Sequence, residues 1–221
     1  MTYEVYTISG APRPWRVMLG FVAKGINFEI RNLEGSKREH KSADFLALNP
    51  RGRVPVLKNR DFVLPESIAI LSYLDKLHPE PPLFGTTAEE HARIWQLISE
   101  CEHYCRPGNS ALLGPIFFRG QNDTNEEVRN GATTVHEEFK RLEKLLEGSR
   151  FLCDERMTAA DCVCFPEVRL VLRAAERFPE IMQRLEFHSF DQAYPRLNAW
   201  VVRIEALPGY EKTYPPHWRS P

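Results

Sequence analysis

The sequence predicts an α/β domain followed by a domain built only of helices, and two observations support this prediction. Up to residue 77, short stretches that alternate apolar and polar residues take turns with stretches of helical spacing. After the Pro-Glu-Pro-Pro segment at 79–82, apolar residues recur at steps of three and four. Because that segment is stiff and lacks backbone donors, it marks a boundary. We therefore expect domains at residues 1–83 and 84–221.

The first elements follow from the local pattern and from the residues that end each one. Residues 3–8 alternate and favour a strand, and residues 15–24 have a helical spacing that ends at Gly25. Residues 26–30 alternate again, and residues 42–48 suit a short helix. The order of elements in this part is βαβα.

A β-hairpin is predicted next, from two short apolar runs at 55–57 and 62–65 that flank the polar turn Lys-Asn-Arg-Asp. Pro55 starts the first run, where its missing N–H is tolerated, and it is a candidate for the cis isomer. Such a turn would leave the N–H and C=O of Val54 pointing outward, ready to pair with an extended peptide. With the helix that follows, the order is βαβαββα, a thioredoxin-like arrangement of layers.

The start of that helix is a second binding feature. Glu66 and Ser67 lead directly from the hairpin into the apolar helical run 68–74. The first turn of a helix has free N–H groups and the positive end of the helix dipole, which favour a carboxylate. Backbone pairing on one side and carboxylate binding on the other predict a small peptide ligand.

The second half is expected to contain four regular helices and one irregular stretch. Thr158 and Asp161 cap the third of these helices, and we assign them to stability alone, at about 1 kcal/mol or more each. That helix is apolar around most of its circumference, which predicts the buried centre of the domain. The predicted helices cover residues 87–105, 128–146, 158–172 and 195–204, with an irregular apolar piece from 107 to 118.

Composition and charge limit the classes of partner. The chain has 221 residues, 43% hydrophobic and 27% charged, which is enough for one or two ordinary cores. The net charge of −1 gives no broad attraction for nucleic acid or for an anionic membrane. The first residues contain no basic and apolar leader, and no apolar run approaches the roughly 20 residues that a bilayer requires. We expect a soluble cytoplasmic protein.

The five cysteines all lie after residue 100. Their odd number favours reduced, buried thiols over a disulfide framework, and the absence of a Cys-x-x-Cys pair argues against structural zinc, so no metal is expected. A first domain without a thiol cannot carry out disulfide exchange. This excludes glutaredoxin-type activity and mechanisms that use an active-site cysteine.

The motif at residues 49–57, Asn-Pro-Arg-Gly-Arg-Val-Pro-Val-Leu, is followed by Glu-Ser-Ile-Ala-Ile at 66–70. Together they resemble the glutathione-binding fingerprint of the cytosolic glutathione transferase family. Within this family, four shorter segments are most similar to the rho class. These segments are Trp15-Arg16, the run Glu-His-Lys-Ser at 39–42, Ala-Asp-Cys-Val-Cys-Phe-Pro at 160–166 and the tail Pro-Pro-His-Trp at 215–218. The resemblance covers nearly the whole chain.

The resemblance implies that glutathione is a co-substrate and that the protein is a homodimer. Val54 and Pro55 would hold its cysteinyl backbone, while Ser67 would bind the γ-glutamyl carboxylate and Glu66 the ammonium. For the glycyl carboxylate, the cationic or donor candidates are His40, Lys41 and Arg53.

The thiol of glutathione needs a donor aimed at sulfur, because its reference pKa of about 8.5 leaves only a few per cent as thiolate near pH 7. Lowering that pKa by roughly two units takes about 2.7 kcal/mol of thiolate stabilisation. The serine that some classes use falls on Ala11, which has no hydroxyl. Ser9 is our candidate catalytic donor, with Thr7 and the backbone N–H groups of residues 10–13 as alternatives.

The second substrate is expected to be a small hydrophobic electrophile, bound by Pro12, Arg13, Tyr104 and Phe165. The predicted reaction is conjugation of the glutathione thiolate to that electrophile, which is detoxification chemistry. One alternative is a ligand-binding protein with little turnover, which Ala11 makes credible. A second is a glutathione-dependent isomerase of the zeta type, although that class has Ser and Cys in the turn occupied here by Ala11, Pro12 and Arg13.

Overall fold

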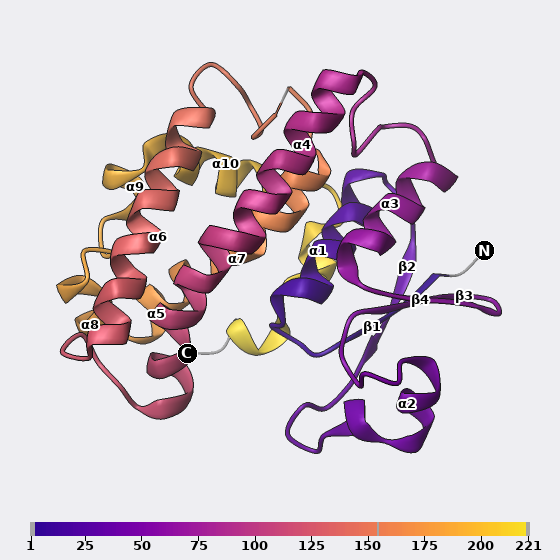
Figure 1. Cartoon of the computed structure of the whole chain (residues 1–221), viewed down its shortest axis with the longest axis horizontal. Coiled ribbons are helices and arrows are strands. Elements are labelled where there is room, and N and C mark those ends of the chain that lie inside the picture. Colours follow the sequence, from indigo (N-terminus) through magenta and orange to yellow (C-terminus); the bar gives the residue numbers. More distant parts are fainter. Residues whose placement is uncertain (1–2, 154, 220–221) are drawn as a thin grey trace. The chain divides into compact units, whose positions relative to one another are not determined.

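The computed structural model describes residues 3–153 and 155–219, and these form two compact units (Figure 1). The first unit contains the chain up to Thr86 together with the segment from Ala206 onward, and the second contains Thr87–Glu205. The predicted division placed everything after residue 83 in the second domain. The structure differs at the carboxyl end, because residues 206–219 group with the first unit.

A four-stranded mixed sheet in the order β2-β1-β3-β4 is the centre of the first unit. β1 pairs in parallel with β2, while β3 is antiparallel to both β1 and β4. Central residues of the sheet such as Val5 and Leu57 are completely buried. The predicted thioredoxin-like order is confirmed. The strands are β1 (Tyr3–Thr7), β2 (Phe28–Asn32), β3 (Val56–Asn59) and β4 (Phe62–Pro65).

Helices cover both faces of this sheet. α1 (Pro12–Ala23) and α3 (Ser67–Leu77) lie together on one side, and α2 (Ala43–Leu48) lies on the other (Figure 1). α1 begins three residues before the predicted start, because Pro12 fits the first turn of a helix, where an N–H is not needed. Short 3₁₀ turns complete the unit at Glu39–Lys41, Tyr210–Lys212 and Pro216–Trp218.

The regular structure of the second unit, among the residues described, consists of helices joined by loops. It contains α4 (Ala88–Glu100), a π-helical turn at Cys101–Cys105, α5 (Arg106–Arg119), α6 (Glu126–Leu145), α7 (Ala159–Arg177), α8 (Pro179–Arg184), α9 (Phe190–Ala193) and α10 (Pro195–Glu205). The prediction of an irregular piece at 107–118 is wrong. The π-helical turn Cys101–Cys105 leads directly into α5, with helical backbone at Cys105, so the chain stays helical through Pro107.

The buried start of α7 organises the second unit, as predicted. Asp161 is completely buried and accepts hydrogen bonds from the N–H groups of Leu152 (2.9 Å) and Thr158 (2.8 Å). It also accepts from the Thr158 hydroxyl (2.8 Å) and from Trp200 Nε1 (2.9 Å). Four donors on one carboxylate join the start of α7 to α10 and to the preceding loop.

Candidate functional site

The turn between β1 and α1 positions the candidate catalytic residue. Gly10 has a φ of +82°, and the Ala11 N–H donates to the Ile8 carbonyl oxygen at 3.0 Å. This tight turn brings the chain from the end of the strand directly to the start of α1, with Ser9 half-buried at its side. The predicted location of the reacting centre, after the first strand and beside a helix start, is therefore a defined turn in the structure.

Backbone N–H groups are scarce at this helix start. Pro12 and Pro14 have none, the Ala11 N–H bonds to Ile8, and the Trp15 N–H lies 3.4 Å from the Ala11 carbonyl oxygen. Within residues 10–13, the other backbone N–H groups that are candidate donors to sulfur belong to Gly10 and Arg13. A side-chain donor is correspondingly more important for the chemistry of this site.

The two hydroxyl candidates differ in their surroundings. Thr7 is 3% exposed, and its hydroxyl donates to the Ile8 carbonyl oxygen at 3.2 Å. Ser9 is more accessible, and its Oγ lies 3.1 Å from Nδ1 of His217 in the carboxyl-terminal 3₁₀ turn. Ser9 is thus better placed than Thr7 to meet a ligand, and an imidazole is its hydrogen-bond partner.

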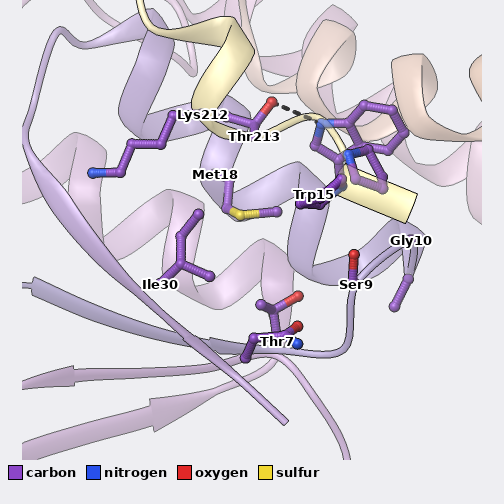
Figure 2. Close-up of a pocket in the computed structure, with 12 residues that line it drawn as sticks. Thr7, Ser9, Gly10, Trp15, Met18, Ile30, Lys212 and Thr213 are labelled. Carbon is purple, nitrogen blue, oxygen red and sulfur yellow. Dashed lines mark hydrogen bonds between the residues drawn. The ribbon is translucent and has the colours of Figure 1, made fainter. Parts of the chain in front are cut away.

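A cavity of about 180 Å³ lies beside Ser9, entirely within the first unit. Figure 2 shows its walls, which come from β1, β2, α1 and the carboxyl-terminal segment. Met18 and Ile30 make it largely apolar, while Thr213 accepts a hydrogen bond from Trp15 Nε1 at 2.9 Å. The cavity therefore offers space for an apolar group next to the Ser9 hydroxyl.

A second group of residues shapes the loop before β3. The Asn49 side chain donates to the Arg53 carbonyl oxygen (2.7 Å) and accepts from the Arg51 N–H (3.1 Å). Lys41 Nζ donates to the carbonyl oxygens of Gly52 (2.7 Å) and Arg51 (3.2 Å). Asn49 and Lys41 together fix the backbone that leads into Pro55.

His40, Lys41 and Arg53 were predicted to bind a glycyl carboxylate. Lys41 also holds the backbone of the loop before β3. The Arg53 side chain is exposed, while its carbonyl oxygen is held by Asn49. His40 is half-buried, and its Nδ1 is a buried atom without a hydrogen-bond partner among the described residues. The prediction that Lys41 binds the glycyl carboxylate therefore has to include its hydrogen bonds to the loop.

Around the residues predicted to bind a peptide ligand, the backbone has the cis-proline and the helix start that the sequence predicted. The bond between Val54 and Pro55 is cis, and the ladder of β3 with β4 begins at Val56, so Val54 lies outside the paired registers. Glu66 has a φ of +72°, a conformation that costs an L-residue free energy, and its side chain is exposed. Ser67 is buried at the first position of α3, where the helix N–H groups and dipole favour an anion.

The residues predicted for the electrophile are less uniform. Pro12 and Arg13 are half-buried in the first turn of α1, and Tyr104 is 54% exposed in the second unit. Phe165 is completely buried and packs edge-on against Trp200, with ring centroids 5.8 Å apart. The prediction for Phe165 is wrong, because a ring with no exposed surface in the centre of α7 cannot touch a substrate.

Sequence reasoning gave no role in the site to Asn49 and His217. Asn49 was visible as the first residue of the fingerprint, but its amide has a role only once the loop is closed. His217 stands in the Pro-Pro-His-Trp tail, which was noted only as a class similarity. Trp218 of the same tail is 9% exposed and packs edge-on against Trp15, with ring centroids 5.4 Å apart.

No group of three or more His, Cys, Asp and Glu side chains among the described residues is arranged to hold a metal ion. No helix within residues 3–153 and 155–219 combines the length and the apolar character that a membrane span requires.

A mixed sheet with a cis-proline before β3, a helix beginning at a buried serine and an all-helical second unit define a two-domain protein of the thioredoxin-like class. Residues 1–76 match the family model for the glutathione S-transferase N-terminal domain, and residues 107–208 match that for its C-terminal domain. Glutathione S-transferase theta-2 of Homo sapiens is 32% identical over 208 residues, which are 90% of this chain and 79% of the human one. The chain belongs to the glutathione S-transferase family, whose members are transferases that use glutathione as co-substrate.

Two further matches agree with this result. Glutathione S-transferase 1 of Dianthus caryophyllus is 30% identical over 168 residues, 75% of each chain. The crystal structure of a glutathione S-transferase from the Antarctic clam Laternula elliptica has a TM-score of 0.83 and 28% identity, covering 100% of this chain and 95% of that one. The family and the fold therefore extend over the whole chain.

Proposed function

We propose that this protein conjugates the thiolate of glutathione to small hydrophobic electrophiles, with Ser9 as the side chain that stabilises the sulfur. The observation that carries the proposal is the position of the Ser9 hydroxyl, half-buried after β1, beside an apolar cavity and next to the first turn of α1. A hydroxyl there can donate to a thiolate while the electrophile approaches from the apolar side.

Glutathione would be held at both ends by the first unit. The N–H and C=O of Val54 would pair with its cysteinyl backbone, as expected for a residue just before the β3 ladder. The buried Ser67 would bind the γ-glutamyl carboxylate at the start of α3, and the exposed Glu66 would accept from the ammonium. His40 and Arg53 would meet the glycyl carboxylate, with Lys41 supporting their loop.

The electrophile would contact Pro12 and Arg13 in the first turn of α1. For Tyr104, whose side chain is 54% exposed in the second unit, contact with the electrophile stays a prediction from the sequence. The rho class remains our proposal for the class, and the buried pair Trp15 and Trp218 supports a defined place for the tail motif that suggested it. We also propose that the protein is a homodimer located in the cytoplasm and that it acts in detoxification.

The alternative function is a binding protein with little turnover, because Ala11 occupies the position where other classes have a catalytic serine. An assay of conjugation to an activated aryl halide, run beside a calorimetric titration with glutathione, separates the two. We expect binding together with a rate well above the buffer reaction. Binding without such a rate would favour the alternative, and the absence of binding would refute both.

A further inference from the structure

The carboxyl-terminal segment, from Ala206 onward, packs against other residues of the first unit. Trp15 Nε1 donates to Thr213 Oγ1 at 2.9 Å, and both residues are almost completely buried. Trp218 packs edge-on against the same indole, with ring centroids 5.4 Å apart. These contacts hold the turn Pro216–Trp218 against α1, so the position of His217 is determined by packing on both sides of it in sequence.

His217 lies directly on the turn after β1. A Cβ atom built on Gly10 would come within 3.1 Å of His217 Cε1 and 3.2 Å of Trp218 Nε1. A side chain at this position would require His217 or Trp218 to shift by a few tenths of an ångström, and the φ of +82° at Gly10 favours glycine as well. The imidazole of His217 thus packs directly against the backbone of the turn at Gly10.

The imidazole meets the candidate catalytic hydroxyl, with 3.1 Å between Ser9 Oγ and His217 Nδ1. A serine hydroxyl alone is a poor acceptor for a thiol proton near neutral pH, whereas an imidazole is a good one. We propose that His217 is a positioning residue that receives the proton of the glutathione thiol through Ser9. This inference rests on the proposed role of Ser9 in conjugation.

The proton transfer needs no further reactant. The S–H bond of glutathione breaks and its proton goes to Ser9 Oγ, while the hydroxyl proton of Ser9 moves to Nδ1 of His217. The products are a thiolate, an intact serine hydroxyl and an imidazolium. Nδ1–H then donates to Ser9 Oγ, and the Ser9 hydroxyl donates to the thiolate sulfur. The imidazolium later releases its proton to the product or to water.

This arrangement explains how the site works with alanine at position 11. The N–H groups of the α1 start are few, because Pro12 and Pro14 have none and the Ala11 N–H bonds to Ile8. A hydroxyl paired with an imidazole supplies both the hydrogen bond to sulfur and an acceptor for its proton. The tail of the chain thereby becomes a component of the reacting centre.

The test compares three variants of the full-length protein. His217→Asn places an amide where Nδ1 stood, so it keeps a hydrogen-bond partner for Ser9 but accepts no proton. His217→Leu removes both properties, and His188→Asn, at an exposed position of the second unit, is the matched control. Each is measured for glutathione binding by calorimetry, for the ultraviolet absorbance of the bound thiolate at pH 7, and for kcat and KM.

We expect both His217 variants to lose thiolate absorbance and kcat by about tenfold or more, while the Kd and KM for glutathione change by about twofold or less. His188→Asn should match the parent protein in every measurement. If His217→Asn retains full kcat while His217→Leu loses it, the imidazole acts only as a hydrogen-bond partner and the proton transfer is refuted. A merely structural tail would instead change binding and kcat together.

A double-mutant cycle tests the route through Ser9. In a Ser9→Ala background, His217→Asn should cause about a twofold further loss or less, because two residues that act as one unit are not additive. Independent, multiplying effects would overturn the inference. If the parent protein conjugates the aryl halide and neither His217 variant changes it, only the inference fails. If the parent protein does not bind glutathione, the proposed function fails first.

Discussion

Lys24 Nζ lies 2.8 Å from Asp75 Oδ1 and thereby links the end of α1 to α3. The lysine side chain has no exposed surface, and that of Asp75 is 17% exposed. The same ammonium donates to the carbonyl oxygens of His78 (2.6 Å) and Pro81 (2.7 Å), while Asp75 accepts from the Leu83 N–H (2.7 Å). One ion pair thus fixes both helices and the proline-rich segment that follows them.

Replacement of this lysine should be strongly destabilising. In Lys24→Met the carboxylate of Asp75 and two carbonyl groups lose their buried partner, and we expect the free energy of unfolding to fall by about 3 kcal/mol. Urea unfolding followed by circular dichroism measures this. Lys37→Met removes an exposed pair with Glu34, whose side chains are 69% and 51% exposed, and should cost less than about 1 kcal/mol. Equal losses in the two variants would contradict the role of Lys24.

Two glycines with nearly the same positive φ provide a second test. Gly52 has a φ of +57° and Gly25 a φ of +63°. A Cβ on Gly52 would lie 2.7 Å from Lys41 Nζ and 2.8 Å from the His40 carbonyl oxygen, whereas one on Gly25 would meet nothing within 4 Å. Gly25→Ala should therefore cost only the conformational penalty of about 1–2 kcal/mol.

Gly52→Ala adds a clash with backbone, so its loss of stability should exceed that of Gly25→Ala by about 1 kcal/mol or more. Because the loop before Pro55 has to move, glutathione affinity should fall as well. Thermal unfolding and calorimetry measure the two effects. Similar stability and unchanged affinity in both variants would show that the loop tolerates the displacement.

Ser67, at the start of α3, is proposed to bind the γ-glutamyl carboxylate of glutathione directly. Ser67→Ala removes a hydroxyl whose hydrogen bond to a carboxylate is worth about 1.5–3 kcal/mol, so the Kd for glutathione should rise roughly 10- to 150-fold. The matched control is Ser72→Ala, at an exposed position of the same helix, for which no change in Kd is expected. A Ser67 variant with the parent affinity would remove the γ-glutamyl site from this helix start.

The parts of the fold that were predictable depend on local chemistry. Gly25 ends α1 with a positive φ. The predicted hairpin of β3 and β4 is present, although its turn is only Arg60 and Asp61, because Lys58 and Asn59 pair with β4. The cap of α7 by Thr158 and Asp161 is equally local, since its groups are three residues apart. Such signals lie within one or two turns of chain, and a single sequence contains them completely.

The parts that were missed depend on contacts between distant positions. Ser9 and His217 are 208 residues apart, and nothing in either neighbourhood indicates the other. The apolar run around Phe165 is compatible with a cleft wall or with a core, and only the packed structure distinguishes them. Lys41 is similar, because a charged loop residue reads as solvated until the carbonyl oxygens of Arg51 and Gly52 close around it.

The cysteines of the second unit should show strongly unequal reactivity. A hydrogen bond with the thiol of Cys101 and then burial hold the pKa of Cys105 well above its usual value, and the same causes act on Cys164. Since the thiolate is the reactive form, these groups stay protonated even at pH 8, and Cys162 is completely buried. Cys153 is half-buried, so a chromogenic disulfide reagent should modify about one thiol rapidly in the folded protein and all five after denaturation. Loss of the rapid phase in Cys153→Ser would identify Cys153 as the reactive thiol. Fast reaction of two or more thiols in the folded state would contradict the prediction, because it would show that the buried cysteines become exposed readily.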